Sequence, residues 1–209
     1  MKQKQTVTRA YNFEIRAENN EKNGDYITGR PIVYDSVTDL GCFNEVIERG
    51  ALDKANLKDV RFLVNHDTSM IPLARSRNNN ENSTMQLEVD KDGMSIRVNL
   101  DTENNTEARN LYSAIKRGDI TGMSFMFTID DEEWEDLESD HPIRHIRKIG
   151  IVFEVSAVTF PAYESTEISA RDREALESAK SVLESAKRSL ESDKETLELE
   201  KAKLRNKFF

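Results

Sequence analysis

Cysteine, histidine and the turn-forming residues are scarce in this chain of 209 residues, which contains 1 Cys, 3 His, 4 Pro and 8 Gly. The single cysteine, Cys42, excludes an internal disulfide and is typical of a protein from a reducing compartment. No cysteine–histidine cluster, HExxH helix or glycine-rich phosphate loop occurs in the sequence. We therefore expect neither a metal nor an organic cofactor.

Long apolar runs and clusters of positive charge are also missing. No segment approaches the ~18 apolar residues of a membrane-spanning helix. The N-terminal residues MKQKQTVTRA lack the apolar stretch of a signal peptide. The formal net charge is −9, and the sequence has no patch of Lys and Arg suited to phosphate contacts. These absences predict a soluble cytosolic protein that binds neither membranes nor nucleic acid.

The composition changes sharply near Glu164. Before this point, alternating apolar residues and turn signals dominate, and the hydrophobic content of 37% is enough for one domain with a core. After it, no Gly or Pro interrupts residues 165–207, and leucine recurs at every seventh position: Leu176, Leu183, Leu190, Leu197 and Leu204. We expect a domain at 1–164 and a charged helical tail, similar to a coiled coil, at 165–209.

The partner of this helical tail is left open by the sequence. Ala179 and Ala186 follow two of the leucines at the second position of a coiled-coil seam, but Asp193 and Glu200 occupy the equivalent later positions. A partner helix, self-association, and packing of a narrow apolar stripe on its own domain all fit this pattern.

The residues before the tail predict a mostly β domain. Alternation and turn signals indicate strands at Tyr11–Ala17, Tyr26–Tyr34, Val60–His66, Met85–Val89, Met94–Leu100, Met123–Ile129 and, split near Gly150, Arg144–Thr159. Pro31 indicates an edge or a bulge in its strand. Helices are expected at Phe43–Arg49 and Thr106–Arg117, each followed by a glycine. The acidic residues 130–140 are expected to form a surface loop, anchored by Trp134.

His66 and Ser124 are the first two candidate functional residues. In a strand over Val60–His66, alternate side chains share one face, so the imidazole would end a core-facing row. A capped core histidine is the alternative, although a chain with 3 histidines offers few other general bases. Ser124 follows Gly122, which allows close approach of a substrate, and begins an apolar strand. Many serines that begin strands have no function, so Ser124 alone is a weak signal.

Glu154 is the third candidate, because it lies in a strand whose two faces are both apolar. A carboxylate buried there must be paired or hydrogen-bonded. An arginine such as Arg61 or Arg75 could be the partner. The alternative partner is His66, whose tautomer the carboxylate would fix as in serine hydrolases. Ser156 is a weaker candidate in the same segment.

Other reactive residues offer rival sites. Cys42 precedes the helix expected at Phe43–Arg49, and a helix N-terminus lowers the pKa of a thiol, although a free cysteine is more often a small buried apolar residue. His141 and His145 have the spacing of a helical metal pair, but Pro142 between them disfavours that helix.

Four segments together resemble a known family. FNEVIERGAL, VRFLVNHD, GDITGMSFMF and FEVSAVTFPAYESTEI are similar, in order and spacing, to the prohead proteases of HK97-type tailed phages, which are related in fold to the herpesvirus assemblins. The resemblance covers roughly Tyr11 to Ala170. It implies a mainly β (α+β) fold, an assemblin-like closed or strongly curved antiparallel β-barrel with a few helices, followed by the C-terminal helix.

The same resemblance implies a catalytic triad. His66 would be the base and Ser124 the nucleophile. The third member is histidine in the assemblins and an acidic residue in many phage enzymes, which favours Glu154 here over His141 or His145. Assemblins also place arginines near the oxyanion, but residues 159–166 contain no arginine. Backbone N–H groups are then the expected oxyanion donors.

The implied activity is that of a serine endopeptidase in the host cytoplasm, inside the immature capsid or prohead. Its expected partners and substrates are the major capsid protein and the scaffold, and often the protease itself. The tail would dock on scaffold helices or be removed during maturation. A non-enzymatic capsid-assembly module that works through its coil, and a cysteine hydrolase based on Cys42, are the alternatives.

Overall fold

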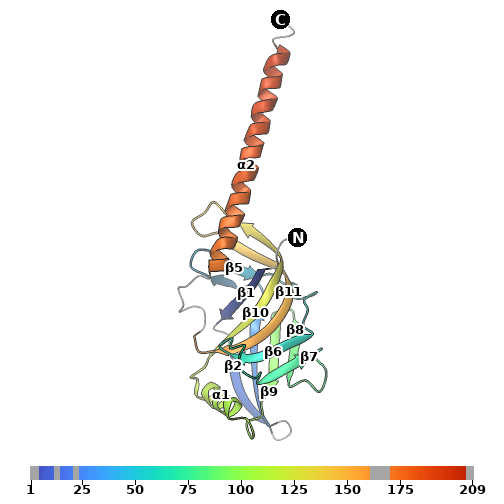
Figure 1. The fold of residues 1–209 in the computed structure, drawn as a ribbon, viewed down its shortest axis with the longest axis vertical. Helices are drawn as coiled ribbons and strands as arrows, with labels where there is room; N and C mark the ends of the chain where they lie inside the picture. Colours follow the sequence, from blue (N-terminus) through green and yellow to red (C-terminus); the bar gives the residue numbers. More distant parts are fainter. Residues whose placement is uncertain (1–4, 12–14, 21–23, 161–169, 206–209) are drawn as a thin grey trace.

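The structure, a computed structural model, describes residues 5–11, 15–20, 24–160 and 170–205. These residues form a mostly β protein with two helices (Figure 1). The larger sheet has the order β1 (Gln5–Tyr11), β10 (Gly122–Glu135), β11 (Ile143–Val158), β5 (Asn44–Ile47) and β4 (Val37–Asp39), while β6 (Asp59–Val64) pairs with β11 and β7 (Ala74–Arg77). The smaller sheet has the order β2 (Ile15–Asn20), β3 (Gly24–Val33), β9 (Gly93–Asn99) and β8 (Met85–Asp90).

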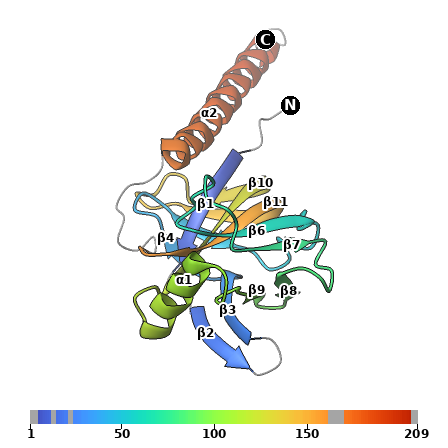
Figure 2. The ribbon, with the colours of Figure 1, turned by 60° about the horizontal axis from the view of Figure 1, so that its bottom comes forward.

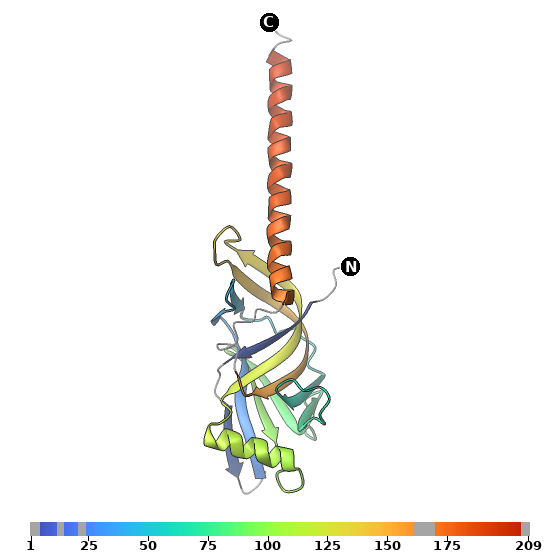
Figure 3. The same ribbon diagram turned by 60° about the vertical axis from the view of Figure 1, so that its left-hand side comes forward.

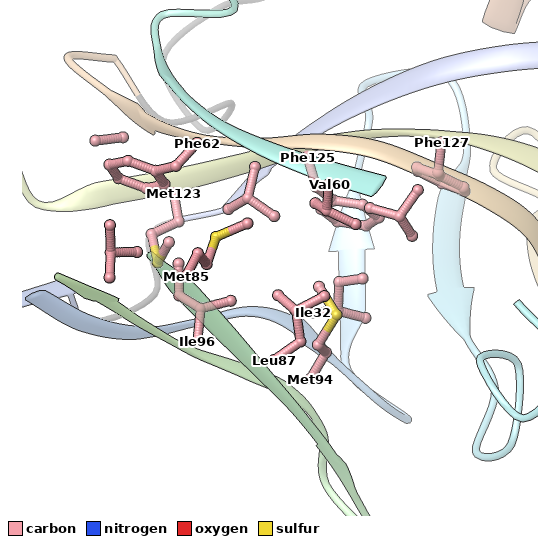
Figure 4. Close-up of a cluster of buried hydrophobic side chains, with 14 of the residues drawn as sticks. Ile32, Val60, Phe62, Met85, Leu87, Met94, Ile96, Met123, Phe125 and Phe127 are labelled. Carbon is pink, nitrogen blue, oxygen red and sulfur yellow. The ribbon is translucent and has the colours of Figure 1, made fainter. Parts of the chain in front are cut away.

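The core lies between the two sheets (Figure 4). Each sheet contributes the apolar side chains of one face, because neighbouring residues of a strand point to opposite sides. The larger sheet supplies Val60, Phe62, Met123, Phe125 and Phe127, and the smaller sheet supplies Ile32, Met85, Leu87, Met94 and Ile96; all are buried. Burying each such side chain stabilises the fold by about 1.5–3 kcal/mol. This core fixes the position of β10 and β6, which carry candidate site residues.

The expected closed or strongly curved antiparallel barrel is wrong. Neither sheet closes or curls strongly, and β1, β4 and β7 end the larger sheet as edge strands. The larger sheet is also mixed, because β11 pairs in parallel with β5 over Ile143–Ile146 and with β6 over Glu154–Ala157. Closure would require edge strands to pair with one another. Here the two parallel partners of β11, β5 and β6, lie along one side of this long strand, with β10 on the other side.

The helix expected at Phe43–Arg49 is also wrong. Residues Asn44–Ile47 form strand β5, in which Glu45 and Ile47 are buried while Asn44 and Val46 are half-buried. Pairing with β4 and β11 outweighs the local helical propensity and makes this segment a strand. Gly50, whose φ is 87°, lies within a turn and does not end a helix.

The expected acidic loop at residues 130–140 is only partly correct. Strand β10 continues to Glu135, and Trp134 in its last part packs edge-on against Phe43 at 4.9 Å between ring centroids. The expected split near Gly150 is a local irregularity within one continuous β11, opposite register shifts in β10. A Cβ at Gly150 would lie 2.6 Å from Thr128 Oγ1 and closer still to Asp130 Oδ1, so any other residue there would displace these two side chains of β10.

Other expectations are confirmed. Strands β8 and β9 form the predicted hairpin, and a register shift in β3 between Gly29 and Ile32 supplies the bulge expected at Pro31. Helix α1 (Thr106–Arg117) has Asn105 as its N-cap and left-handed Gly118 as its C-cap, and it packs on β2 and β3 (Figure 2). The strand expected at Tyr11–Ala17 instead falls on β1 and β2, in different sheets, with residues 12–14 outside the described part.

Helix α2 (Ala170–Arg205) confirms a long C-terminal helix and projects away from the β sheets (Figure 3). The expected domain boundary at residue 164 lies outside the described residues. The beginning of α2 is buried against the β domain at Asp172 and Leu176, whereas Val182 and Leu190 are 68% and 61% exposed. Further along α2, Lys187 pairs at the surface with Glu138, which lies between β10 and β11. Asp172 joins a buried ionic network with Arg9, Glu45 and Arg144 that connects α2 to β1, β5 and β11.

Candidate active site

Three separate segments place the candidate residues at the same face of the larger sheet. Ser124 on β10 lies directly opposite Ser156 on β11, and residues directly opposite one another project to the same face. Glu154 precedes Ser156 by two residues and therefore shares that face. His66 follows β6, which runs parallel beside β11 over Glu154–Ala157. This face points away from the core. The neighbouring residues Met123 and Phe125 point into the core instead (Figure 4).

His66 lies in a turn and not at the end of a strand. Strand β6 ends at Val64, and Asn65 and His66 both adopt left-handed conformations, with φ of 50° and 59°. Such conformations are uncommon for residues other than glycine and direct the chain out of the strand. The expectation that His66 continues the row of Val60 is therefore wrong, and the imidazole instead reaches Glu154 of the neighbouring strand.

Asn65 holds this turn in place. Its side chain accepts a hydrogen bond from the Thr159 backbone N–H at 2.9 Å and donates one to Thr159 Oγ1 at 3.1 Å. Its own backbone N–H donates to the Ala157 carbonyl at 2.9 Å. The turn is thus bound to the end of β11. The sequence reasoning overlooked Asn65, although asparagine is the residue type, after glycine, that best tolerates a left-handed conformation.

The buried carboxylate of Glu154 pairs with His66. Its Oε1 lies 2.5 Å from His66 Nδ1, and its Oε2 accepts a hydrogen bond from Ser156 Oγ at 2.6 Å. The Glu154 side chain is 3% exposed and the imidazole 22%. The alternative partners, Arg61 and Arg75, both donate to Asp59 instead. Since an ionised carboxylate only accepts hydrogen bonds, His66 then carries a proton on Nδ1 and presents Nε2 as an acceptor.

Ser124 lies on this face without a hydrogen bond to His66. Its side chain is fully buried, and Oγ donates to the backbone carbonyl of Arg9 on β1 at 2.8 Å. Among the described residues, the structure thus joins His66 to Glu154 directly and places Ser124 beside them across β11. Contacts between a nucleophile and its base are often formed only when substrate binds.

The rival reactive residues lie in poorer surroundings. Cys42 precedes strand β5 rather than a helix, and burial raises the pKa of its thiol above the ordinary value. Both changes make it a weaker nucleophile near neutral pH than the sequence suggested. His145 pairs with Val46 in the first half of β11, and its ring contacts Glu48 and Glu135. His141 lies near Asp39 and Asn44.

The described residues contain neither a cluster of metal-binding side chains nor a membrane-spanning helix. No group of three or more His, Cys, Asp or Glu side chains in that part of the chain is arranged to hold a metal ion. Neither α1 nor the described length of α2 is apolar enough to cross a membrane.

A histidine paired with a buried carboxylate, on one sheet face with a serine, provides the residue types of a serine hydrolase. The family model of the caudovirus prohead serine proteases matches residues 11–181. The chain therefore belongs to the caudovirus prohead serine protease family, which confirms the resemblance carried by the four sequence segments.

Comparison with individual proteins adds less. No curated protein sequence matches the chain. Among solved structures, the bacteriophage T4 capsid assembly protease, gp21, is 16% identical and aligns over 76% of this chain and 99% of its own, with a TM-score of 0.45.

Proposed function

We propose that this chain is a serine endopeptidase of capsid maturation in which Ser124 is the nucleophile, His66 the general base and Glu154 the residue that orients His66. Membership of the prohead serine protease family supports proteolysis in the prohead. The observation that carries the residue assignment is the 2.5 Å contact between His66 Nδ1 and buried Glu154, on the sheet face that also bears Ser124.

In the proposed reaction, the Ser124 hydroxyl rotates from the Arg9 carbonyl toward His66. Its Oγ attacks the scissile carbonyl while His66 Nε2 takes the proton and then passes it to the leaving amine. Glu154 keeps the proton of the neutral ring on Nδ1 and stabilises the imidazolium that forms. A water molecule, deprotonated by His66, then hydrolyses the acyl-enzyme and restores Ser124. Backbone N–H groups are the proposed oxyanion donors.

The proposed substrates are the major capsid protein, the scaffold and the protease itself, within the prohead of the infected cell. We assign catalysis to residues 1–164 and attachment to the tail at 165–209. Helix α2 supports the second assignment, because it projects from the sheets and exposes Leu190 of the leucine stripe to 61%. A helix of the scaffold, or of a second copy, would cover this stripe. Normal packaging of a protease that lacks the tail would contradict the attachment role.

Co-expression with the cognate capsid and scaffold proteins tests the proposed residues. We expect processed bands with the wild type, with Cys42→Ala and with Ser76→Ala, and none with Ser124→Ala or His66→Ala. Ser76 is a matched control, since its hydroxyl is equally buried but has no hydrogen-bond partner among the described residues. Unchanged processing by Ser124→Ala would overturn the proposal. If neither the wild type nor any variant processes these proteins, but capsid assembly still depends on the tail, a non-enzymatic assembly module is favoured instead.

A further inference from the structure

The hydroxyl of Ser156 lies at the centre of the candidate active site. Ser156 is fully buried on β11, directly opposite Ser124. Its Oγ donates to Glu154 Oε2 at 2.6 Å and accepts from the backbone N–H of His66 at 3.1 Å. We infer that Ser156 is a positioning residue that holds both the carboxylate and the histidine of the proposed triad in their working orientation. This inference rests on the function proposed above.

The hydrogen-bond inventory of the cluster supports this role. A serine hydroxyl has one proton to donate and can also accept. Ser156 gives its proton to Glu154, so the second carboxylate oxygen is held while the first faces His66 Nδ1. Both carboxylate oxygens are therefore fixed, and the carboxylate plane cannot turn away from the imidazole. Outer partners of this kind orient reactive groups in other enzymes.

The second contact of Ser156 acts on the backbone of His66. His66 and Asn65 are two consecutive residues in the left-handed region, a conformation that must be stabilised by its surroundings. The Ser156 hydroxyl accepts the His66 N–H at this strained position. The Ser156 hydroxyl thus holds His66 in two ways. It bonds directly to the backbone N–H of His66, and it holds the Glu154 carboxylate that contacts the ring.

Ser156 is not itself a rival nucleophile. Its only hydroxyl proton is directed to Glu154, and the contact that joins it to His66 involves the backbone rather than the ring. Removal of the hydroxyl would leave one oxygen of the buried carboxylate and the His66 N–H without their partner. The predicted consequence is a histidine that samples wrong orientations while the substrate still binds.

Three substitutions at Ser156 separate the effect of its hydroxyl from the effect of side-chain shape. Ser156→Thr keeps the hydroxyl, Ser156→Val has the shape of threonine without it, and Ser156→Ala removes it without adding volume. With a peptide substrate, we expect kcat to fall about tenfold to a hundredfold in the Val and Ala variants, with KM changed less than about twofold. We expect Ser156→Thr to retain kcat within about threefold. Ser76→Ala, the control at a buried hydroxyl that has no hydrogen-bond partner in the described part of the chain, should match the wild type.

Nitrogen-15 NMR of the His66 ring provides a readout independent of activity. In the Ser124→Ala background, we expect one Nδ1–H tautomer with Ser156 present and a mixture of tautomers in Ser156→Val. Wild-type kcat and an unchanged ring signal in the Val and Ala variants would overturn the inference. So would failure of both variants to fold, because the hydroxyl would then serve stability. If Ser124→Ala is itself active, the proposed nucleophile fails while the ring signal still decides the role of Ser156.

Discussion

Two clusters of buried polar side chains lie along β11, and they differ in how completely their groups are paired. The first half of the strand carries Arg144, which joins Arg9, Glu45 and Asp172 in the ionic network. The second half carries Glu154 and Ser156, which join His66. Both clusters contain buried carboxylates with nitrogen donors, so burial of charge alone does not distinguish a structural site from a reactive one.

In the ionic network, the charges neutralise one another. Arg9 contacts Glu45 at 2.5 and 2.8 Å and Asp172 at 2.7 and 3.2 Å, and Arg144 reaches Glu45, Asp172 and Glu132. Burial alone would lower the pKa of Arg9, but the carboxylates of Glu45 and Asp172 raise it overall above its ordinary value. These partners keep the guanidinium charged and leave little capacity for a ligand.

The cluster around His66 keeps one position open. Glu154 and Ser156 are buried and paired, yet none of the described residues hydrogen-bonds the ring nitrogen Nε2, and the imidazole is 22% exposed. Arg9 links the network to the proposed nucleophile, because its side chain belongs to the network and its carbonyl accepts the Ser124 hydroxyl. The network thus holds β1 against Ser124, while the cluster with the open nitrogen is the one suited to chemistry.

The largest expected effect comes from Glu154→Gln, which removes the charge and keeps the shape. The amide could still hydrogen-bond to Ser156. Toward His66 it would present an N–H donor or an uncharged oxygen, so the tautomer with its proton on Nε2 would be favoured. We expect kcat to fall about 10³–10⁴-fold, while thermal unfolding changes little. Steady-state kinetics with a peptide substrate would check this. A kcat within threefold of the wild type would show that Glu154 is structural, like the carboxylates of the network.

Breaking the network should instead affect stability. Asp172→Ala removes the residue through which α2 binds Arg9 and Arg144, and leaves buried guanidinium groups with fewer partners. We expect a loss of about 3 kcal/mol in the free energy of unfolding, measured by urea denaturation. Glu184→Ala, on the exposed part of the same helix, is the matched control and should change it by less than about 0.5 kcal/mol. Equal effects of the two substitutions would show that the network does not anchor α2.

The sequence predicted elements whose signals are local. Helix α1 has a capping asparagine and a terminal glycine, and the hairpin of β8 and β9 turns through Lys91-Asp92 directly before Gly93, so local chemistry determined both. Strand β5 and the open shape of the sheets depend on pairing with distant residues, in particular the parallel pairs of β11, and local patterns do not contain that information. The local pattern of Phe43–Arg49 therefore predicts a short helix where the structure has strand β5.

For the candidate site, the cost of burying a carboxylate correctly singled out Glu154 as a residue that needs a partner, and the structure supplies His66. The sequence did not reveal how His66 reaches it. That depends on two successive left-handed residues and on the contacts of Asn65 with Thr159, 94 residues further along the chain. The sequence offers Ser156 only as a weaker candidate, because a serine in an apolar strand gives no sign of the groups around its hydroxyl.

A smaller effect is expected from Asn65, because it supports the turn that carries His66 and is not a member of the proposed triad. Asn65→Ala would lose both side-chain hydrogen bonds with Thr159. It would also place alanine, which lacks the local hydrogen bonds of asparagine, in a left-handed conformation with φ of 50°. We expect a loss of about 2 kcal/mol in stability and a lower kcat. Asn65→Gly loses the same contacts but tolerates the conformation, so it should be less destabilised than Asn65→Ala. The reverse order in thermal or urea unfolding would argue against strain at this turn.

The smallest effect is expected at Cys42, the rival nucleophile. Burial raises the pKa of its thiol, so the fraction present as thiolate at neutral pH is lower than for an ordinary cysteine. Its reaction with a thiol reagent should therefore be slow at neutral pH and increase as the pH rises through and beyond the ordinary range of a thiol. Cys42→Ser should leave capsid-protein processing within about twofold of the wild type, since no carboxylate–histidine pair like that of Glu154 and His66 serves it among the described residues. If Cys42 is modified rapidly at neutral pH and its modification abolishes processing, the reactive residue lies beside the ionic network and not in the cluster around His66. The contrast between the two halves of β11 would then be wrong.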